Sequence, residues 1–229
     1  MECMYYEKTK DNKIKCHLCP HSCTISEGNT GICNVRKNVE GKLISLNYGK
    51  HTSYAYDPIE KKPLYHFYPG RDILSIGSFG CNLKCDFCQN WDIAHEESLT
   101  MEIEDKDILL LGKSKDSIGI AYTYNEPTIS YEYLHHMLRL AKRHGLKNVL
   151  VTNGYINEEP LKELLPNIDA MNIDLKSMRD GFYKNICKGT LEPVLNTIQL
   201  ATKFTHVEIT NLIIEGENSS EEEIRDLSQ

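Results

Sequence analysis

The chain lacks several features that would direct it to a membrane or a nucleic acid. No apolar run approaches the roughly 20 residues that a helix needs to cross a bilayer. The first ten residues, MECMYYEKTK, lack the apolar core of a secretory signal. There is no long run of lysine and arginine, and the net charge is −7. These absences predict a cytoplasmic protein that binds neither a membrane nor a nucleic acid.

Internal repeats and low-complexity tracts are also absent from the 229 residues. Hydrophobic residues make up 40% and charged residues 26%, which is typical of a globular protein. The length suits one large domain, or a domain with a small appendage. Nine cysteines are present, and without an export signal we expect them to be reduced thiols. They therefore point to metal or redox chemistry rather than to disulfides.

Three cysteines fall close together in GCNLKCDFCQNW, residues 80–91, and no fourth lies nearby. Cys81, Cys85 and Cys88 match neither the four-cysteine run of two-cluster ferredoxins nor the paired cysteines of zinc sites. Three thiolates on a cubane iron–sulfur cluster leave one iron open, and that iron can bind a substrate directly. The alternative is plain packing, because the three positions would share one face of a helix. The polar residues between them make a regular amphipathic helix a poor description.

A second group of cysteines precedes these, with the spacing C-x2-C-x3-C-x9-C: Cys16, Cys19, Cys23 and Cys33. Four thiolates match both a closed zinc site and a second iron–sulfur cluster, and His17 or His21 could replace one of them. The intervening segment is too short and polar to bury four free thiols at low cost. We predict a metal site here, with zinc ahead of iron–sulfur because no electron-transfer context is evident. Cys3 and Cys187 stand apart and are expected to have no special role.

Apolar runs alternate with helical stretches from Asp72 onward. The runs span residues 73–78, 118–124, 148–154, 169–176 and 206–214, and the helical stretches include 128–145 and 192–204. Apolar strands alternating with helices predict a parallel sheet covered by helices, with its chemistry at the carboxyl ends of the strands. We assign residues 71–229 to this domain. Residues 1–70 form a separate cysteine-rich segment of short strands, limited by Pro58 and Pro63.

Polar residues follow these strands, and the carboxyl ends of parallel strands meet at one rim. They comprise Asn125 and Glu126, Thr152 and Asn153, Asp174 and Lys176, and Thr210 and Asn211. The segment NEPT also has the pattern of a helix start, with a polar cap and then proline in the first turn. Asn153-Gly154 is equally typical of an ordinary turn. The structural and functional interpretations can hold together.

The motifs resemble those of a known family over nearly the whole chain. The segments CHLCPHSCTISEGNTGICNVR, DPIEKKPLYHFYPG, GCNLKCDFCQNWDIA, YTYNEPTISYEY, VTNGYI, MNIDLK, LEPVLNTI and EITNLII are similar to the radical S-adenosylmethionine (SAM) enzymes of the AmmeMemoRadiSam system. Those enzymes are related to the pyruvate formate-lyase activating enzymes. The resemblance implies an α/β fold, a partial (β/α)6 TIM-like barrel.

The resemblance also implies a set of ligands. Cys81, Cys85 and Cys88 would hold a [4Fe-4S] cluster whose fourth iron is chelated by the amino and carboxylate groups of SAM. Phe87 would lie beside the adenine, and Glu126 would accept a hydrogen bond from the methionine ammonium, with Asn125 close by. The segments around strands three and four would border the ribose and carboxylate with Thr152, Asn153, Asp174 and Lys176. Many relatives have Gly-Gly-Glu-Pro where this chain has Tyr124-Asn125-Glu126-Pro127.

The activity implied by the resemblance is the reductive cleavage of SAM to a 5′-deoxyadenosyl radical that takes a hydrogen atom from a substrate. The nearest analogy is a glycine of a partner protein, with flavodoxin or ferredoxin as the reductant. One alternative is a non-catalytic iron–sulfur electron carrier, which does not need the polar residues of the rim. Another is a zinc-stabilised interaction module, which requires a fourth ligand near Cys88.

The last residues, EGENSSEEEIRDLSQ, predict a helix capped by Ser219 or Ser220, with glutamates in its first turn. The related enzymes continue with another strand and a segment that covers the barrel mouth. We therefore expect a barrel truncated at its C-terminus, with the fifth strand as an unpaired edge.

Overall fold

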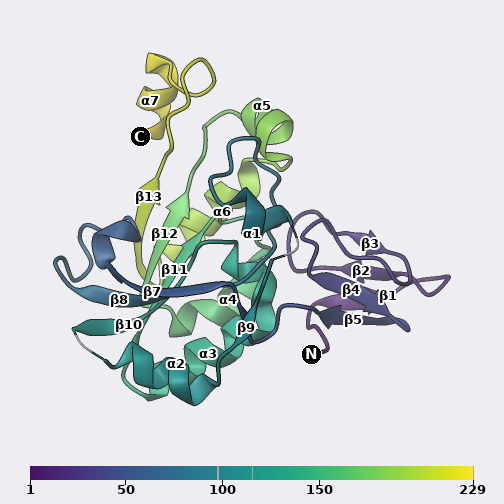
Figure 1. Ribbon diagram of the computed structural model, residues 1–229. Helices are drawn as coiled ribbons and strands as arrows, with labels where there is room; N and C mark the ends of the chain where they lie inside the picture. Colours follow the sequence, from purple (N-terminus) through teal and green to yellow (C-terminus); the bar gives the residue numbers. More distant parts are fainter. Residues whose placement is uncertain (97, 115, 229) are drawn as a thin grey trace.

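A six-stranded sheet forms the centre of the computed structural model, which describes residues 1–96, 98–114 and 116–228 (Figure 1). The strand order is β13-β12-β11-β10-β8-β7. Five of the strands are parallel neighbours, and all five were predicted: β8 (Asp72–Gly77), β10 (Ser117–Tyr122), β11 (Lys147–Thr152), β12 (Ala170–Asp174) and β13 (His206–Thr210). β13 lies at one edge of the sheet, as expected.

The sixth strand was not predicted as part of this sheet. β7 (Ser53–Pro58) pairs antiparallel with β8 along its whole length, from Ser53 opposite Gly77 to Pro58 opposite Asp72. It lies on the N-terminal side of the boundary that we placed at residue 70. The division of the chain at that point stays a prediction, and the structure shows that the main sheet extends across it.

Helices pack along the sheet, with α2 (Asp105–Gly112) against β8 and β10, α3 (Tyr131–Arg143) against β11 and α6 (Glu192–Ala201) against β13. α4 (Glu158–Leu164) lies between α3 and α6. The face of α3 that the sequence predicted as apolar is buried, and the chain turns at Gly145 with φ +74°. No helix in the described part of the chain is both long and apolar enough to span a bilayer.

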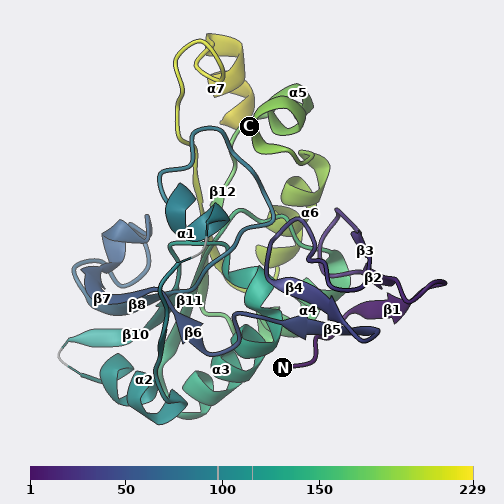
Figure 2. The same ribbon diagram turned by 45° about the vertical axis from the view of Figure 1, so that its right-hand side comes forward.

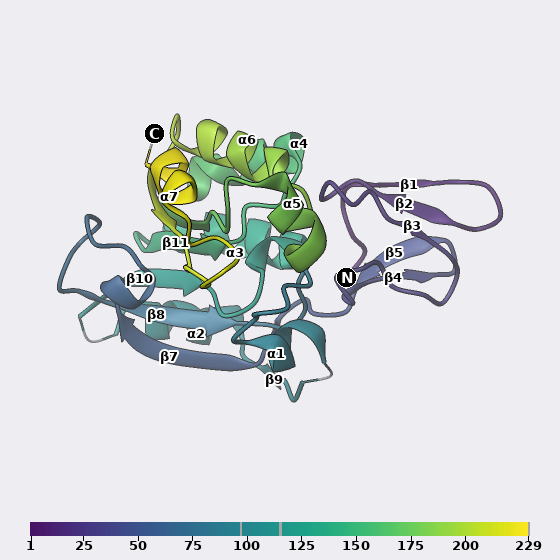
Figure 3. The ribbon, with the colours of Figure 1, turned by 90° about the horizontal axis from the view of Figure 1, so that it is seen from above.

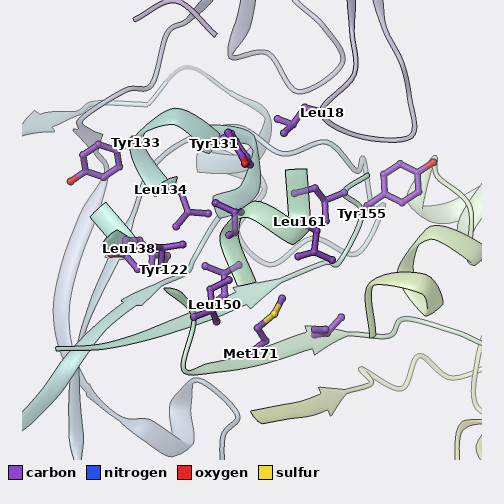
Figure 4. Close-up of a cluster of buried hydrophobic side chains, with 14 of the residues drawn as sticks. Leu18, Tyr122, Tyr131, Tyr133, Leu134, Leu138, Leu150, Tyr155, Leu161 and Met171 are labelled. Carbon is purple, nitrogen blue, oxygen red and sulfur yellow. The ribbon is translucent and has the colours of Figure 1, made fainter. Parts of the chain in front are cut away.

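The two faces of the sheet bury different sets of side chains, because successive residues of a strand point to opposite sides. Leu150 and Met171 pack against Leu134, Leu138 and Leu161 of the helices, in the cluster that Figure 4 shows. On the other face, inside the curved sheet, lies a smaller apolar cluster that is closed by the connection between β7 and β8: Ile59, Leu64, Ile73, Ala121, Val149 and Ala170. This cluster lies inside the sheet, below the carboxyl ends of its strands.

The cysteine-rich segment lies beside the barrel, at the right in Figures 1 and 2. It contains a three-stranded sheet of β1 (Tyr6–Lys8), β2 (Ile14–Cys16) and β3 (Thr24–Ile25), and a hairpin of β4 (Arg36–Val39) and β5 (Lys42–Ser45). A buried ion pair joins it to the barrel, where the guanidinium of Arg36 lies 3.1 Å from the Glu132 carboxylate of α3. β6 (Lys50–His51) pairs with β9 (Met101–Glu102) nearby.

Short elements connect the strands, and several gather at the end of the barrel that Figure 3 views. They are the 3-10 turns η1 (Ile59–Lys61), η2 (Pro127–Ser130) and η3 (Leu165–Asn167), the helices α1 (Trp91–His95), α5 (Asp180–Phe182) and α7 (Glu221–Leu227), and the π-helix η4 (Tyr183–Cys187). Ser220 caps α7 by accepting a hydrogen bond from the Glu223 N–H at 3.2 Å, which confirms one of the two predicted caps.

Candidate cofactor site at the carboxyl ends of the strands

A cavity of about 400 Å³ lies at the carboxyl ends of the parallel strands. It is lined by the whole set of residues that the sequence analysis proposed for the iron–sulfur cluster and for SAM: Cys81, Cys85, Cys88, Phe87, Asn125, Glu126, Thr152, Asn153, Asp174 and Lys176. They come from the last residues of β11 and β12 and from the segments that follow β8, β10, β11 and β12. The volume is in the range of pockets that enclose a small organic ligand.

The three cysteines lie in an irregular loop and not on a helix, so they do not share one helix face. The loop begins at Gly80, whose φ is +90° and whose Cβ, if present, would lie 2.7 Å from the Cys33 carbonyl oxygen. Only glycine fits at this contact. Asn82 then fixes the loop to β11, because its side chain donates to the Tyr155 carbonyl at 2.7 Å and accepts from Asn153 at 2.9 Å.

The thiols in this loop are held in a largely apolar environment. Burial and, to a smaller extent, the nearby Glu126 carboxylate raise the pKa of Cys81 to about 12. Asn153 donates a long hydrogen bond of 3.6 Å to the Cys81 sulfur. A thiol with so high a pKa stays protonated at neutral pH unless a metal displaces the proton.

The three cysteines line one cavity. Among the described residues, no three Cys, His, Asp or Glu side chains are placed around one metal ion. Three thiolates are the number that leaves one iron of a cubane cluster without a protein ligand.

Glu126 is fully enclosed at the start of η2, where it acts as the N-cap. One carboxylate oxygen, Oε1, accepts from the Thr128 N–H, the Thr128 hydroxyl and the Thr152 hydroxyl, at 2.7–3.0 Å. The other, Oε2, accepts from the Asn153 N–H at 2.8 Å and from no other group in the described part of the chain. Burial raises the pKa of Glu126 in spite of these donors. A carboxylate oxygen has two lone pairs and Oε2 uses one of them, so Oε2 can take a further donor.

Tyr124 stands where many relatives have glycine, and its backbone keeps a glycine-like conformation with φ +72°. Its hydroxyl donates to Asp57 at 2.9 Å, and the Lys62 ammonium lies 4.8 Å from the centre of its ring. Gly77 leaves room for that ring, since a Cβ there would come within 2.8 Å of it. The DPIEKK segment thus stabilises a strained backbone next to Asn125 and Glu126.

Asp174 and Lys176 form an ion pair of 3.1 Å at the end of β12. Burial lowers the pKa of Lys176, but the Asp174 carboxylate, the Cys85 sulfur and Tyr183 together outweigh it, and the pKa is raised overall. The Lys176 ammonium also lies 5.6 Å from the centre of the Phe87 ring, which packs at 5.9 Å from Phe182. These contacts bring the predicted adenine neighbour next to the charged pair.

Sequence analysis gave Cys187 no role, and the structure places it against the cysteine loop. Its thiol lies beside that of Cys85 and raises the pKa of Cys85, and it is fully buried at the end of the π-helix η4. The carbonyls of Ile186 and Cys187 accept from the N–H groups on either side of Cys85, at 3.2 and 2.9 Å. Because Cys187 and Cys85 are far apart in the chain, the sequence gave no indication that they lie together.

The four N-terminal cysteines line a second, much smaller cavity of about 10 Å³, together with Arg36 and Ile129. Burial raises the pKa of Cys19 to about 12. His17 pairs with Glu7 at 3.2 Å, and His21 hydrogen-bonds the Asn82 carbonyl at 2.7 Å, so both imidazoles have other partners. Since no three described ligands surround a single ion, zinc is not supported here, and a metal at these cysteines stays a prediction.

Comparison with known proteins gives one family and several relatives. The profile of the Radical SAM superfamily matches residues 75–228. An uncharacterized protein of Methanocaldococcus jannaschii is 48% identical over 223 residues, which cover 96% of this chain and 66% of that protein. The pyruvate formate-lyase 1-activating enzyme of Escherichia coli (strain K12) is 26% identical over 145 residues, which cover 60% of this chain and 59% of that enzyme.

Among solved structures, Streptococcus suis SuiB bound to S-adenosylmethionine aligns with a TM-score of 0.52 and 19% sequence identity. The alignment covers 65% of this chain and 34% of SuiB, and it shows a likeness of fold. The chain spans less than two thirds of the length of the relatives from Methanocaldococcus jannaschii and Escherichia coli.

Proposed function

Because the chain belongs to the radical SAM superfamily, whose members bind a [4Fe-4S] cluster and SAM, we propose that Cys81, Cys85 and Cys88 hold that cluster. SAM would occupy the rest of the same cavity. The observation that supports this most is that three thiols and seven further predicted ligands, from four separate loops, line one cavity of suitable size. An electron carrier without catalysis would not need those seven residues.

When bound, the cluster and SAM supply a 5′-deoxyadenosyl radical that abstracts hydrogen. The protein binds and orients the reactants. Oε2 of Glu126 has one acceptor position left and would accept a hydrogen bond from the ammonium of the methionine part of SAM. A cation at that position would stabilise the charged form of Glu126, which burial disfavours. Phe87 would present its ring to the adenine, and the Asp174–Lys176 pair would border the ribose and carboxylate.

The substrate that we propose is a glycine of a partner protein, so that the chain would act as a glycyl-radical activating enzyme. Support comes from the similarity to the Escherichia coli pyruvate formate-lyase 1-activating enzyme. Flavodoxin or ferredoxin would supply the electron. Membership of the AmmeMemoRadiSam system, which the motifs suggest, belongs to the same proposal.

The proposal is tested by SAM cleavage. Reconstituted protein, kept without oxygen and reduced with dithionite, should form 5′-deoxyadenosine and methionine. Cys85→Ala should form neither, whereas Cys3→Ala, which removes a buried thiol outside both cavities, should behave like the wild type. If Cys85→Ala keeps both the cluster signal and the product, the ligand assignment is wrong.

We propose separately that Cys16, Cys19, Cys23 and Cys33 form a second metal centre. Support comes from their shared cavity and from the buried Arg36 guanidinium beside them, which would offset a small part of the charge of four thiolates. In a variant with Cys81, Cys85 and Cys88 replaced by alanine, elemental analysis should still find metal, and the element found identifies the centre. A folded sample with neither iron nor zinc would exclude the site.

A further inference from the structure

One wall of the cavity is not used by the proposed ligands of the cluster and SAM. It is formed by the connection after β7 and by β12 and β13, with the residues Lys61, Lys62, Pro63, Asn172, Thr210 and Leu212. Asn172 and Asp174 lie on the same face of β12, because they are two residues apart in a strand. Asn172 is therefore the deeper of the two, and this wall is left free by the residues that we propose for the cluster and SAM.

Asn172 carries an unpaired acceptor. Its Nδ2 donates to the Pro63 carbonyl at 3.0 Å and to the Thr210 hydroxyl oxygen at 2.9 Å. The Pro63 carbonyl can only accept, so the orientation of the amide is fixed. Oδ1 is buried and has no hydrogen-bond partner in the described part of the chain. A buried carbonyl without a partner is unusual, and it points to a ligand that donates a hydrogen bond.

The charges beside Asn172 select the kind of donor. Lys61 and Lys62 share one carboxylate, with their ammonium groups 3.6 and 2.8 Å from the oxygens of Asp57. Two cations and one anion leave a positive excess on this wall. This excess disfavours a ligand that carries an ammonium group. A neutral N–H next to a carbonyl oxygen suits the wall better, because the N–H can donate to Asn172 and the carbonyl oxygen can face the positive charge.

We infer that this wall binds a backbone amide of the substrate, with Asn172 Oδ1 accepting the amide N–H and the lysines facing the carbonyl oxygens. This inference rests on the proposed function and assigns the wall of the cavity that would hold the peptide substrate. The Asn172 acceptor holds the peptide plane, so that a hydrogen on the adjacent α-carbon is presented to the SAM side of the cavity. Asn172 is a binding residue and takes no part in the cleavage of SAM.

The experiment uses a capped glycine, N-acetylglycine N-methylamide, as the probe. Two analogues replace one or the other of its N–H groups with an ester oxygen. Binding to the anaerobic wild-type protein, with the cluster oxidised and SAM bound, is measured by saturation-transfer NMR. One of the two ester analogues should bind about tenfold more weakly than the amide, which corresponds to one hydrogen bond at a buried acceptor. Asn172→Ala should bind the amide and that ester equally.

Asn211→Ala is the matched control. Asn211 also has a buried Oδ1 without a partner among the described residues, but it does not line the cavity. Its removal should leave the amide preference intact. The wild-type comparison of amide with ester needs no variant, so the test stands even if Asn172→Ala does not fold.

The inference is overturned if the capped glycine does not bind, if wild type binds the amide and both esters equally, or if Asn211→Ala loses the preference as Asn172→Ala does. Formation of 5′-deoxyadenosine without peptide is measured on the same samples. If it forms but no amide preference is found, the proposed function stands and the substrate inference fails. If it does not form, the proposed function itself fails.

Discussion

Lys61 and Lys62 both contact the Asp57 carboxylate. The variants Lys61→Met and Lys62→Met should nevertheless lower the stability of the fold by very different amounts. Asp57 contacts both ammonium groups, but the Lys62 side chain is 4% exposed and the Lys61 side chain 69% exposed. Lys62 lies 2.8 Å from its carboxylate oxygen and Lys61 lies 3.6 Å from the other. Since methionine is unbranched and only one atom shorter than lysine, the comparison reports mainly the loss of charge.

The expected magnitudes follow from burial. Removing one partner of a buried ion pair costs about 3–5 kcal/mol. Asp57 keeps the Tyr124 hydroxyl at 2.9 Å and the weaker Lys61 contact, so we expect Lys62→Met to lower the free energy of unfolding by about 2–3 kcal/mol. Lys61→Met should cost at most about 0.5 kcal/mol, as for an exposed pair.

The pH dependence gives an independent check. Burial alone would raise the pKa of Asp57, but hydrogen bonds from Lys62 and Tyr124 hold it at about 2, below its ordinary value of 3.8. The pair therefore stabilises the fold above about pH 4, and its contribution is lost as the pH falls towards 2. The difference between Lys62→Met and wild type should shrink over that window.

Urea unfolding of the cluster-free protein, followed by circular dichroism at pH 7 and pH 3, measures both effects without the acid lability of a cluster. Equal losses for the two lysine variants at pH 7 would refute the burial argument. A difference between Lys62→Met and wild type that does not shrink at pH 3 would refute the assigned role of the Asp57 carboxylate.

Three further predictions concern the cysteine loop and its neighbours. Glu126→Gln should retain the cluster but weaken SAM binding by at least about tenfold in calorimetric titration, because the ammonium loses a charged acceptor, and unchanged affinity would argue against the role. Cys187→Ala should make the cluster potential more negative, by on the order of tens of millivolts in a redox titration, while Cys3→Ala leaves it unchanged. Gly80 has φ +90°, and a Cβ there would lie 2.6 Å from Val35, so Gly80→Ala should destabilise the fold by more than about 2 kcal/mol. Gly41→Ala is the control, because φ is +71° and no atom lies within 4 Å of the new Cβ, and it should cost about 1 kcal/mol. Equal effects at the two glycines would show that the contact with Val35 is unimportant.

The parallel strands and their helices could be predicted because each leaves a local signal. Residues 148–154 are a short apolar run that ends at Thr152 and Asn153, and the helix that becomes α3 shows one apolar face over several turns. The rim residues then follow from a general property of parallel sheets, whose strands end on one side. On that side, one cavity is lined by all the residues that were predicted for the cluster and for SAM.

What could not be predicted depends on contacts between distant parts of the chain. β7 is half-exposed and carries no clear apolar pattern, so its pairing with β8 leaves little trace in the sequence. No local pattern indicates a positive φ at Tyr124, because the residues that stabilise this conformation, Asp57 and Lys62, lie far away in the chain. Cys187 lies near Cys85 because the π-helix η4 brings this later part of the chain back to the cysteine loop.

The central claim is that the open iron of a three-cysteine cluster binds SAM directly. Electron paramagnetic resonance of the reduced wild-type protein, recorded with and without SAM, tests it most directly. We predict that SAM changes the signal of the cluster, and that Cys85→Ala shows no such signal. A wild-type spectrum that is the same with and without SAM would contradict the account.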